Sequence, residues 1–275
     1  MSCVSEGRIV ISVVCYRNDD EVVDFARQIE KQDAANRIVL LVTVNKANDY
    51  NELSCKLASV KLECHLYNAN KNLGYLNGSL YGVDQYGKLN SCDKVVISNT
   101  DLTLKNEKTF SDILMNMEDD DIWCLGPSIQ LITGKYQNPF LKERPSNRKI
   151  KIWKIVQGNV ILLWLYTYLS KIKNRMKKKD FADESGFVYS VHGSFFVLNQ
   201  KCVLELAKIS SQIFMYGEEL LVAEIVRANK HKVFYNSQIS ITHNENSTTS
   251  LANMTLKADW YNKSFRFIVQ KFFKD

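Results

Sequence analysis

The stretch KVVISNTD, residues 94–101, joins an apolar, β-branched run to a polar turn that ends in a carboxylate. The run predicts a buried strand over residues 94–98, so Asp101 lies just past the carboxyl end of that strand. Ligands of open α/β sheets bind at this end, where a carboxylate can hold a divalent cation that neutralises a diphosphate. An aspartate at a strand end is more often a turn residue, so its meaning depends on the rest of the chain.

The residues before this stretch repeat its pattern of a buried strand followed by polar side chains. Further strands are predicted at residues 8–15 (RIVISVVC), 37–44 (RIVLLVTV) and 60–67. Helical patterns between them, one capped at Asn18 and one ending near Tyr86, predict an α/β fold with a mostly parallel sheet covered on both faces. The polar segments that follow the strands should converge on one crevice; they begin at Tyr16, Asn45, Asn72 and Asn99.

Two carboxylates open a helix in the second half of the chain. Strands are predicted there at residues 122–127, 189–198 and 232–242, with a helix at 218–229. The sequence FMYGEE ends in Glu218 and Glu219, in the first turn of that helix, where the dipole helps to keep a carboxylate ionised. Adjacent helical residues point about 100° apart, so only one of the two can face a substrate. The alternative is N-terminal helix charge that faces solvent.

Two more motifs carry candidate ligands. His243 begins HNENS after the last predicted strand, and imidazole is a common metal ligand, although a single His there is usually a loop residue. NLGY, residues 72–75, contains a glycine that allows close backbone approach, and a helix that begins there offers N–H groups to anions. The alternative for NLGY is a glycine-containing turn capped by Asn.

Length and composition indicate one domain with an internal insertion. The 275 residues are 45% hydrophobic and include three prolines, and no Gly/Ser/Pro-rich linker divides them. The seven cysteines form no CxxC pair, which argues for a reducing compartment and against a disulfide framework or a zinc site. No secretory signal is predicted at the N-terminus, so we expect the protein to be cytoplasmic.

Positive charge gathers in one segment. Residues 142–179 contain twelve Lys and Arg and one acid, Glu143, which gives +11 against +6 for the whole chain. Residues 152–179 predict a basic, aromatic-rich helical insertion whose apolar part is too short to span a bilayer. Such a helix suits an anionic membrane surface, and a core-packed helix with a solvated basic end is the equal alternative. Nucleic-acid binding is not favoured, because no known binding module frames the segment.

In their order along the chain, these motifs resemble glycosyltransferase family 2, in the branch that builds bacterial capsular and other surface polysaccharides. The resemblance runs from about residue 8 to residue 250, and it rests on YRN (16–18), VNKAND (44–49), NLGY (72–75), NTD (99–101), VHGSFF (191–196), MYGEE (215–219) and His243 with Ser247. It implies the GT-A fold, with a mostly parallel, Rossmann-like sheet flanked by helices. It also implies an inverting, metal-dependent transfer of a sugar from a nucleotide donor.

The resemblance assigns roles to residues of this chain. Asp101 matches the last carboxylate of an Asp-X-Asp-type motif and, with His243, would bind Mn²⁺ or Mg²⁺. Glu219 matches the second carboxylate of the paired-acid motif and would be the catalytic base, with Glu218 as second choice or as an orienting group. The residues expected to line the nucleotide-sugar crevice are Tyr16, Asn45, Asp49, Asn72, Gly74, Asn99, Gly193 and Ser247.

The chain departs from the family pattern at two positions. Asn45 and Asn99 stand where the family often has acids, which leaves Asp49 or Asn48 to contact the nucleoside. These departures keep open the alternative of a catalytically degenerate GT-A scaffold or binding module. A sugar nucleotidyltransferase is less favoured, because the residues after the first strand, YRND, are not a Gly-rich phosphate loop.

The expected organisation is a single GT-A domain over residues 1–275. Its parts are a nucleotide-sugar-binding half (8–130), a basic helical insertion (141–185), an acceptor and catalytic half (186–250) and a C-terminal helical tail (251–275). The expected donor is a UDP- or dTDP-sugar, and the expected acceptor is a glycan or a lipid-linked glycan. A place on the inner face of the cell membrane would bring the crevice close to such an acceptor.

Overall fold

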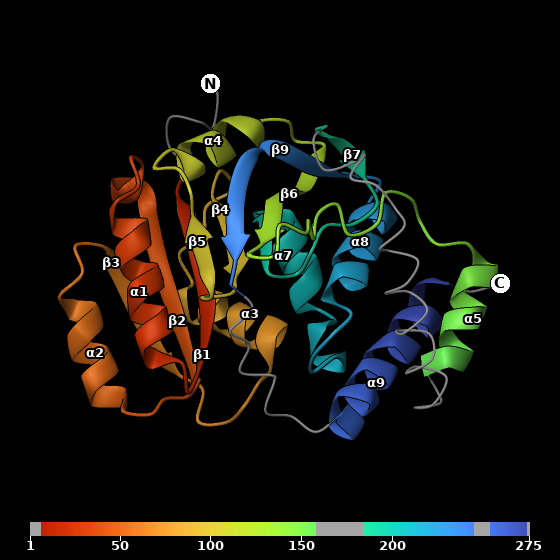
Figure 1. The fold of residues 1–275 in the computed structure, drawn as a ribbon, viewed down its shortest axis with the longest axis horizontal. Helices are drawn as coiled ribbons and strands as arrows, with labels where there is room; N and C mark the ends of the chain where they lie inside the picture. The colour runs from red at the N-terminus through yellow and green to blue at the C-terminus, as the bar shows by residue number, and fades with distance from the viewer. Residues whose placement is uncertain (1–6, 158–183, 245–253, 274–275) are drawn as a thin grey trace.

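A computed structural model describes residues 7–157, 184–244 and 254–273 and shows a curled, nine-stranded sheet flanked by helices (Figure 1). The strands are β1 (Ile9–Tyr16), β2 (Ile38–Lys46), β3 (Glu63–Asn68), β4 (Lys94–Ser98), β5 (Leu102–Leu104), β6 (Ile122–Leu131), β7 (Gly186–Val188), β8 (Phe195–Asn199) and β9 (Lys232–His243). Their order in the sheet is β3-β2-β1-β4-β8-β6-β9-β5, and β7 pairs with β9 beside this path.

The first four strands form a parallel unit. β1 pairs in parallel with β2 and β4, and β2 with β3. Each of the β1, β2 and β4 runs is buried on both faces, as their continuous apolar sequences predict. The predicted strand at residues 94–98 coincides with β4. In this half of the sheet the expected parallel α/β arrangement is confirmed.

The remaining strands make the sheet mixed. β8 pairs antiparallel with both β4 and β6, β9 runs parallel to β6, and β5 and β7 pair antiparallel with β9. The strand predicted at residues 189–198 is shorter in the structure, because β8 begins only at Phe195. The backbone of Tyr189 and Ser190 bonds instead to Lys142 and Leu141. Residues 189–192 therefore follow the segment before α5 (Asn147–Gln157) rather than the sheet.

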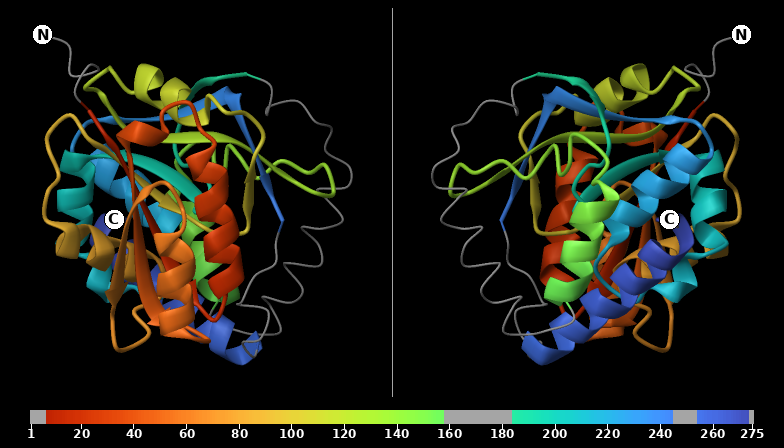
Figure 2. Two further views of the ribbon diagram at one scale, coloured as in Figure 1. Left: turned by 90° about the vertical axis from the view of Figure 1, so that its left-hand side faces the viewer. Right: turned by 90° about the vertical axis from the view of Figure 1, so that its right-hand side faces the viewer.

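Helices cover both faces of the sheet (Figure 2). One face carries α1 (Asp19–Glu30), α2 (Tyr50–Ala58) and α4 (Thr109–Asn116), and the other carries α3 (Tyr75–Tyr86), α7 (Gln200–Ala207) and α8 (Glu218–Ala228). α9 (Met254–Phe272) packs against α8 and α5. Alternate residues of β1 belong to the apolar cores on the two faces of the sheet: Ile9 and Ile11 pack on the α1 side, and Val10 packs on the α3 side.

The cysteines depart in one place from the sequence-based expectation. Five described cysteines are free thiols, namely Cys15, Cys55, Cys64, Cys124 and Cys202. Cys92, however, is disulfide-bonded. The sequence argues against a disulfide framework, and the bridge at Cys92 is a local feature that no motif in the sequence announces.

The basic segment is described only in part. Its first helix, α5, lies beside α9 (Figure 1), and residues 158–183 lie outside the described ranges. Both explanations of the insertion, a membrane-surface helix or a packed helix, thus remain predictions. Among the helices that the structure describes, none combines the length and the apolar character needed to cross a bilayer.

Candidate active site

The end of β2 is joined to the beginning of α3 by Asn45. Its Nδ2 donates to Asn72 Oδ1 (3.1 Å) and to the carbonyl oxygen of Gly74 (3.0 Å), and its Oδ1 accepts from the Leu73 N–H (3.1 Å). Asn72 Oδ1 also accepts from the Gly74 N–H (3.0 Å). The buried Asn45 side chain is therefore engaged in holding the turn before α3, and its contact with a nucleotide stays a prediction.

Gly74 brings two distant parts of the chain into contact. Its φ is +79°, and a Cβ built on it would lie 2.0 Å from the carbonyl oxygen of Phe214. A side chain at position 74 would thus collide with the backbone of the loop before α8. The close backbone approach that the sequence suggests at this glycine is made here to the protein itself, and it places α3 next to the paired carboxylates.

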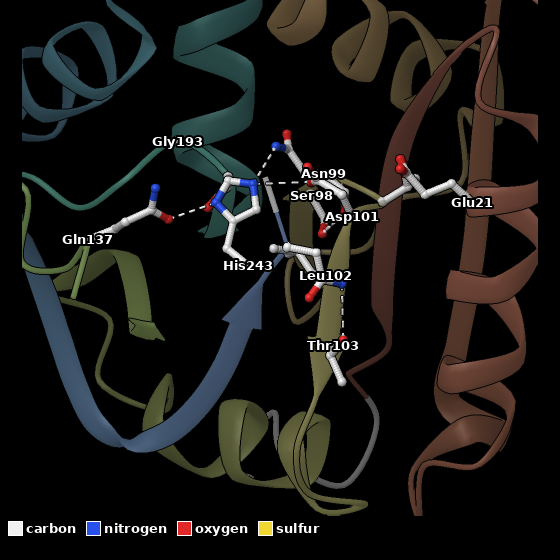
Figure 3. A network of polar contacts seen from close by, with 12 residues as sticks. Glu21, Ser98, Asn99, Asp101, Leu102, Thr103, Gln137, Gly193 and His243 are labelled. Atoms are coloured by element: carbon white, nitrogen blue, oxygen red, sulfur yellow. Dashed lines mark hydrogen bonds and ion pairs between the residues drawn. The ribbon is translucent and has the colours of Figure 1, made fainter. Parts of the chain in front are cut away.

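Asp101 and His243 face each other where β5 begins and β9 ends (Figure 3). His243 Nε2 lies 3.2 Å from Asp101 Oδ1, and the two side chains are 8% and 5% exposed. On the other side of the imidazole, Nδ1 lies 2.7 Å from Gln137 Oε1. Asn99 adds its amide nitrogen 3.5 Å from His243 Nε2. Residues that are far apart in the sequence thus form one polar cluster.

This cluster fits a divalent cation. In the neutral imidazole with its proton on Nδ1, that proton is donated to the Gln137 amide oxygen, and the lone pair on Nε2 points to Asp101. Asp101 Oδ1 is buried and accepts no hydrogen bond. Two electron pairs therefore face each other, and a cation between them would remove their repulsion. No group of three His, Cys, Asp or Glu side chains forms among the described residues, so phosphate oxygens and water would complete the shell of a bound ion.

The NTD turn is also anchored from the side of α1. Asn18 Nδ2 donates to Thr100 Oγ1 (2.8 Å) and to Glu21 Oε1 (2.9 Å), and the Thr100 hydroxyl bonds to Glu21 as well. The backbone N–H of Asn99 donates to the Ser194 carbonyl (2.9 Å) on the opposite side. These bonds fix the turn between the β1 loop and the segment before β8.

Glu218 and Glu219 open α8 and turn in different directions. Glu218 is 7% exposed, and its Oε1 accepts from the backbone N–H of Tyr216 (2.9 Å). Glu219 is half-buried, and its Oε1 accepts from the Gly193 N–H (3.2 Å). A Cβ at position 193 would come within 2.9 Å of that oxygen, so a larger residue there would push the Glu219 carboxylate aside.

Burial changes the acidity of this pair. It raises the pKa of Glu218 to about 8, and the neighbouring charge of Glu219 adds to the effect. Burial also raises the pKa of Glu219, against the backbone N–H groups of Glu219 and Gly193, which favour the ionised form. A carboxylate with a raised pKa is a stronger base than an ordinary one, and this is the property that a general base requires.

Tyr75, the first residue of α3, bonds to the segment that contacts Glu219. Its hydroxyl donates to the Gly193 carbonyl oxygen (2.7 Å). Burial raises the pKa of Tyr75 well above its ordinary value, and the charges of Glu218, Glu219 and Asp101 act in the same direction. The phenol therefore stays protonated among the three carboxylates and fixes the segment that contacts Glu219.

The remaining predicted residues lie in different places. Tyr16 ends β1, and its N–H donates to Asn18 Oδ1 (2.7 Å). Asp49 is exposed and caps α2, since its Oδ1 accepts from the Glu52 N–H (3.0 Å). Its role toward a nucleoside stays a prediction. Ser247 lies outside the described residues.

Sequence reasoning missed three residues that shape the site. Gln137 orients His243, Tyr75 bonds to Gly193, and the buried Asp19 accepts from the N–H groups of Asn48 (3.0 Å) and Asp49 (3.1 Å) after β2. Tyr75 stands in the NLGY motif and was open to prediction. Gln137 carried no signal, because it lies between predicted elements and acts only through the fold.

Several known structures with a similar fold are glycosyltransferases. A mannosyltransferase, PcManGT from Pyrobaculum calidifontis, in complex with GDP-Man and Mn²⁺, matches with a TM-score of 0.56 at 11% identity over 86% of this chain and 56% of that one. GalNAc-T7 with UDP, GalNAc and Mn²⁺ matches with a TM-score of 0.64 at 12% identity over 96% of this chain and 47% of the other. The chain has the GT-A fold.

The match with a third GT-A structure covers a larger share of that structure's chain. S. aureus TarS 1-349 in complex with UDP-GlcNAc has a TM-score of 0.58 at 12% identity, over 97% of this chain and 71% of TarS. By sequence, no protein-family model and no curated protein matches. This chain spans about half the length of the first two GT-A structures. At such low identity the likeness shows the fold alone, and the activity rests on the site.

Proposed function

We propose that the chain is a metal-dependent, inverting glycosyltransferase that moves a sugar from a nucleoside diphosphate donor to a glycan or lipid-linked acceptor. One observation carries the proposal: within a GT-A fold, the Asp101–His243 pair and the Glu218–Glu219 pair lie on either side of one backbone segment, because Gly193 N–H donates to Glu219 and the next carbonyl, that of Ser194, accepts from Asn99, whose side chain lies 3.5 Å from His243 Nε2. The first pair suits a cation and a diphosphate, and the second suits proton transfer.

The reaction needs one proton acceptor and one stabilised leaving group. Asp101 and His243 would hold Mn²⁺ or Mg²⁺, which supplies positive charge next to the departing diphosphate. Glu219 takes the proton from the acceptor hydroxyl while that oxygen forms a bond to C1 of the sugar. The bond from C1 to the diphosphate oxygen breaks with its electron pair, and attack from the opposite face inverts the configuration at C1.

Glu219 suits the role of base better than Glu218. Its carboxylate is half-buried and bonded to Gly193, on the segment before β8. Glu218 is more deeply buried, and its Oε1 is turned back onto the Tyr216 N–H. We therefore propose that Glu218 is the orienting group of the pair, because burial and the charge of Glu219 raise its pKa and leave Glu219 as the group that accepts the proton.

The order of the sequence motifs supports membership of glycosyltransferase family 2 and a role in bacterial surface polysaccharide synthesis, including capsules. A UDP- or dTDP-sugar is the proposed donor. The +11 charge of residues 142–179 supports peripheral attachment to the inner face of the cell membrane. There a cytoplasmic enzyme would meet a lipid-linked acceptor.

Nucleotide release tests the proposal. We expect one member of a panel of UDP-, dTDP- and GDP-sugars to be hydrolysed slowly with Mn²⁺, and hydrolysis to stop with EDTA. The same donor should raise the melting temperature, more so with Mn²⁺ present. Donor binding with neither hydrolysis nor transfer, even when glycan acceptors are added, would favour the scaffold. If no nucleotide sugar changes the melting temperature, the donor site itself is wrongly assigned.

A further inference from the structure

Two aromatic side chains, one of them in the loop that leads into α8, lie outside the apolar clusters of the core. Phe214 lies in the loop just before α8, and Trp260 lies on α9. Their rings meet edge to face, with centroids 5.1 Å apart and planes at 62°. Both side chains are partly exposed, and neither belongs to the apolar clusters on the two faces of the sheet.

The pair lies at the edge of the candidate active site. The carbonyl of Phe214 is the group that approaches Gly74, directly before Tyr75. Asn77 Nδ2 donates to the carbonyl oxygen of Ile213 (2.6 Å), which fixes the same loop on α3. Phe214 also precedes Glu218 and Glu219 by only four and five residues. The backbone that carries Phe214 is thus held between the beginnings of α3 and α8.

Anchoring of α9 does not account for this aromatic pair. One turn after Trp260, the buried Ser264 donates from Oγ to the Met215 carbonyl (2.9 Å). Phe265 and Ile268 of α9 are buried in the core on the same side. These contacts already attach the helix to the loop, so partly exposed rings at position 260 and position 214 have another use.

We propose that Trp260 and Phe214 form a stacking surface for a neutral sugar ring of the acceptor. A pyranose has an apolar face of C–H groups and an edge of hydroxyls, and an aromatic ring matches the former. Phe214 stands five residues before Glu219, so a sugar on this surface would be near the end of α8 that carries the proposed base. The adjacent Glu218 and Glu219 carboxylates disfavour an anionic ligand at this place. This assignment deepens the proposed function and rests on it.

Saturation-transfer NMR on simple glycosides tests the surface without any turnover. The probes are the methyl glycosides of glucose, galactose, mannose and N-acetylglucosamine, added to the full chain without donor or metal. We expect saturation to reach the C–H protons of at least one glycoside. Trp260→Leu, which keeps apolar bulk, should weaken binding about three- to tenfold, whereas Trp260→Phe should retain most of it.

The control is Phe187→Ala, since Phe187 of β7 is an exposed aromatic residue whose ring meets Phe234 of β9 edge to face. It should leave the NMR signal unchanged. Binding of no glycoside to the wild type, or equal binding to Trp260→Leu, would overturn the proposal. Phe214→Leu supplies the same comparison if Trp260→Leu does not fold. Donor hydrolysis, measured separately, fails only if the proposed function fails, so the two ideas can be told apart.

Discussion

Among single residues, Asp101 combines deep burial with a carboxylate oxygen that accepts no hydrogen bond. Asp101→Asn keeps the shape and removes the charge. We expect loss of the Mn²⁺-dependent part of UDP binding, with an unchanged or higher melting temperature, because an unbonded buried charge is itself costly. Titration calorimetry with and without Mn²⁺ measures the effect. Asp24→Asn, at an exposed carboxylate of α1, is the control, and equal Mn²⁺ dependence in both variants would remove Asp101 from the site.

Glu219→Gln separates binding from proton transfer. The amide keeps the acceptor for the Gly193 N–H but cannot take a proton. Sugar transfer should fall by about 10²–10⁴-fold, while donor binding persists. Paired measurements of transfer rate and donor affinity decide the matter. If Glu218→Gln is the inactive variant and Glu219→Gln is active, the order of the pair is reversed.

Glu218 should make stability depend on pH. Its pKa is raised to about 8 in the folded protein, so between the ordinary carboxyl pKa and that value the folded state holds a proton that the unfolded chain has lost. The free energy of unfolding therefore falls as pH rises through this range. Glu218→Gln removes the titration, so its melting temperature relative to wild type should increase from about pH 5.5 to about pH 8.5. Thermal unfolding at both pH values tests this, with Glu52→Gln as an exposed control that shows no trend.

At the scale of elements, regular hydrophobic patterns predicted the parts of the fold that are buried on both faces. β1, β2, β4 and α8 were predicted to within two residues. α2, β5 and α4 were missed, because their short patterns are interrupted by polar residues and gain stability from packing. That Tyr189 bonds to Lys142 rather than to a strand of the sheet could not be predicted either, since its backbone N–H finds a hydrogen-bond acceptor in both arrangements.

The junction of α8, α9 and the segment before α5 depends on Glu224, whose side chain is fully buried. Arg144 bonds to it (Nε–Oε1 2.6 Å) and to the Phe272 carbonyl (2.9 Å), whereas the more exposed Arg227 only adds one bond from within α8 (3.0 Å). Arg144→Ala should therefore reduce the free energy of unfolding by about 2–4 kcal/mol, and Arg227→Ala by about 1 kcal/mol or less. Urea unfolding measures both. Equal losses would mean that the bonds of Arg144 to α9 contribute nothing.

For the whole molecule, the sequence could not place the two halves of the site next to each other by local reasoning. Asp101 and His243 were paired only through the resemblance to a family, because no spacing rule connects residues so far apart. The glycine at position 74 was recognised as special, but its contact with Phe214 depends on how α3 and α8 pack. By contrast, the parallel sheet was enough to predict that the polar segments after its strands would converge at one edge.

The concentration of positive charge in one segment leads to a prediction about membranes. The six basic residues at 171, 173, 175, 177, 178 and 179 should give salt-sensitive binding to anionic vesicles, since each is worth about 1 kcal/mol near such a surface. Changing all six to Gln should abolish vesicle sedimentation and leave donor hydrolysis in solution intact. Sedimentation that is indifferent to these changes or to lipid charge would make the segment an ordinary packed helix. Arg144 is not among the six, because its charge is used inside the protein.

The pairing of β5 with β9 also determines when, during synthesis of the chain, Asp101 and His243 can come together. Asn99 and His243 are 144 positions apart, so a ribosome adding roughly 5–20 residues per second makes the second about 7–30 s after the first. During that interval the parallel unit of β1 to β4 is complete in sequence, while β5 has no partner strand. A nascent or prematurely terminated chain therefore contains the parallel unit and Asp101 but lacks His243, the other member of the proposed cation site. Under the proposed function, a copy that stops before β9 would therefore leave the cell's nucleotide sugars intact.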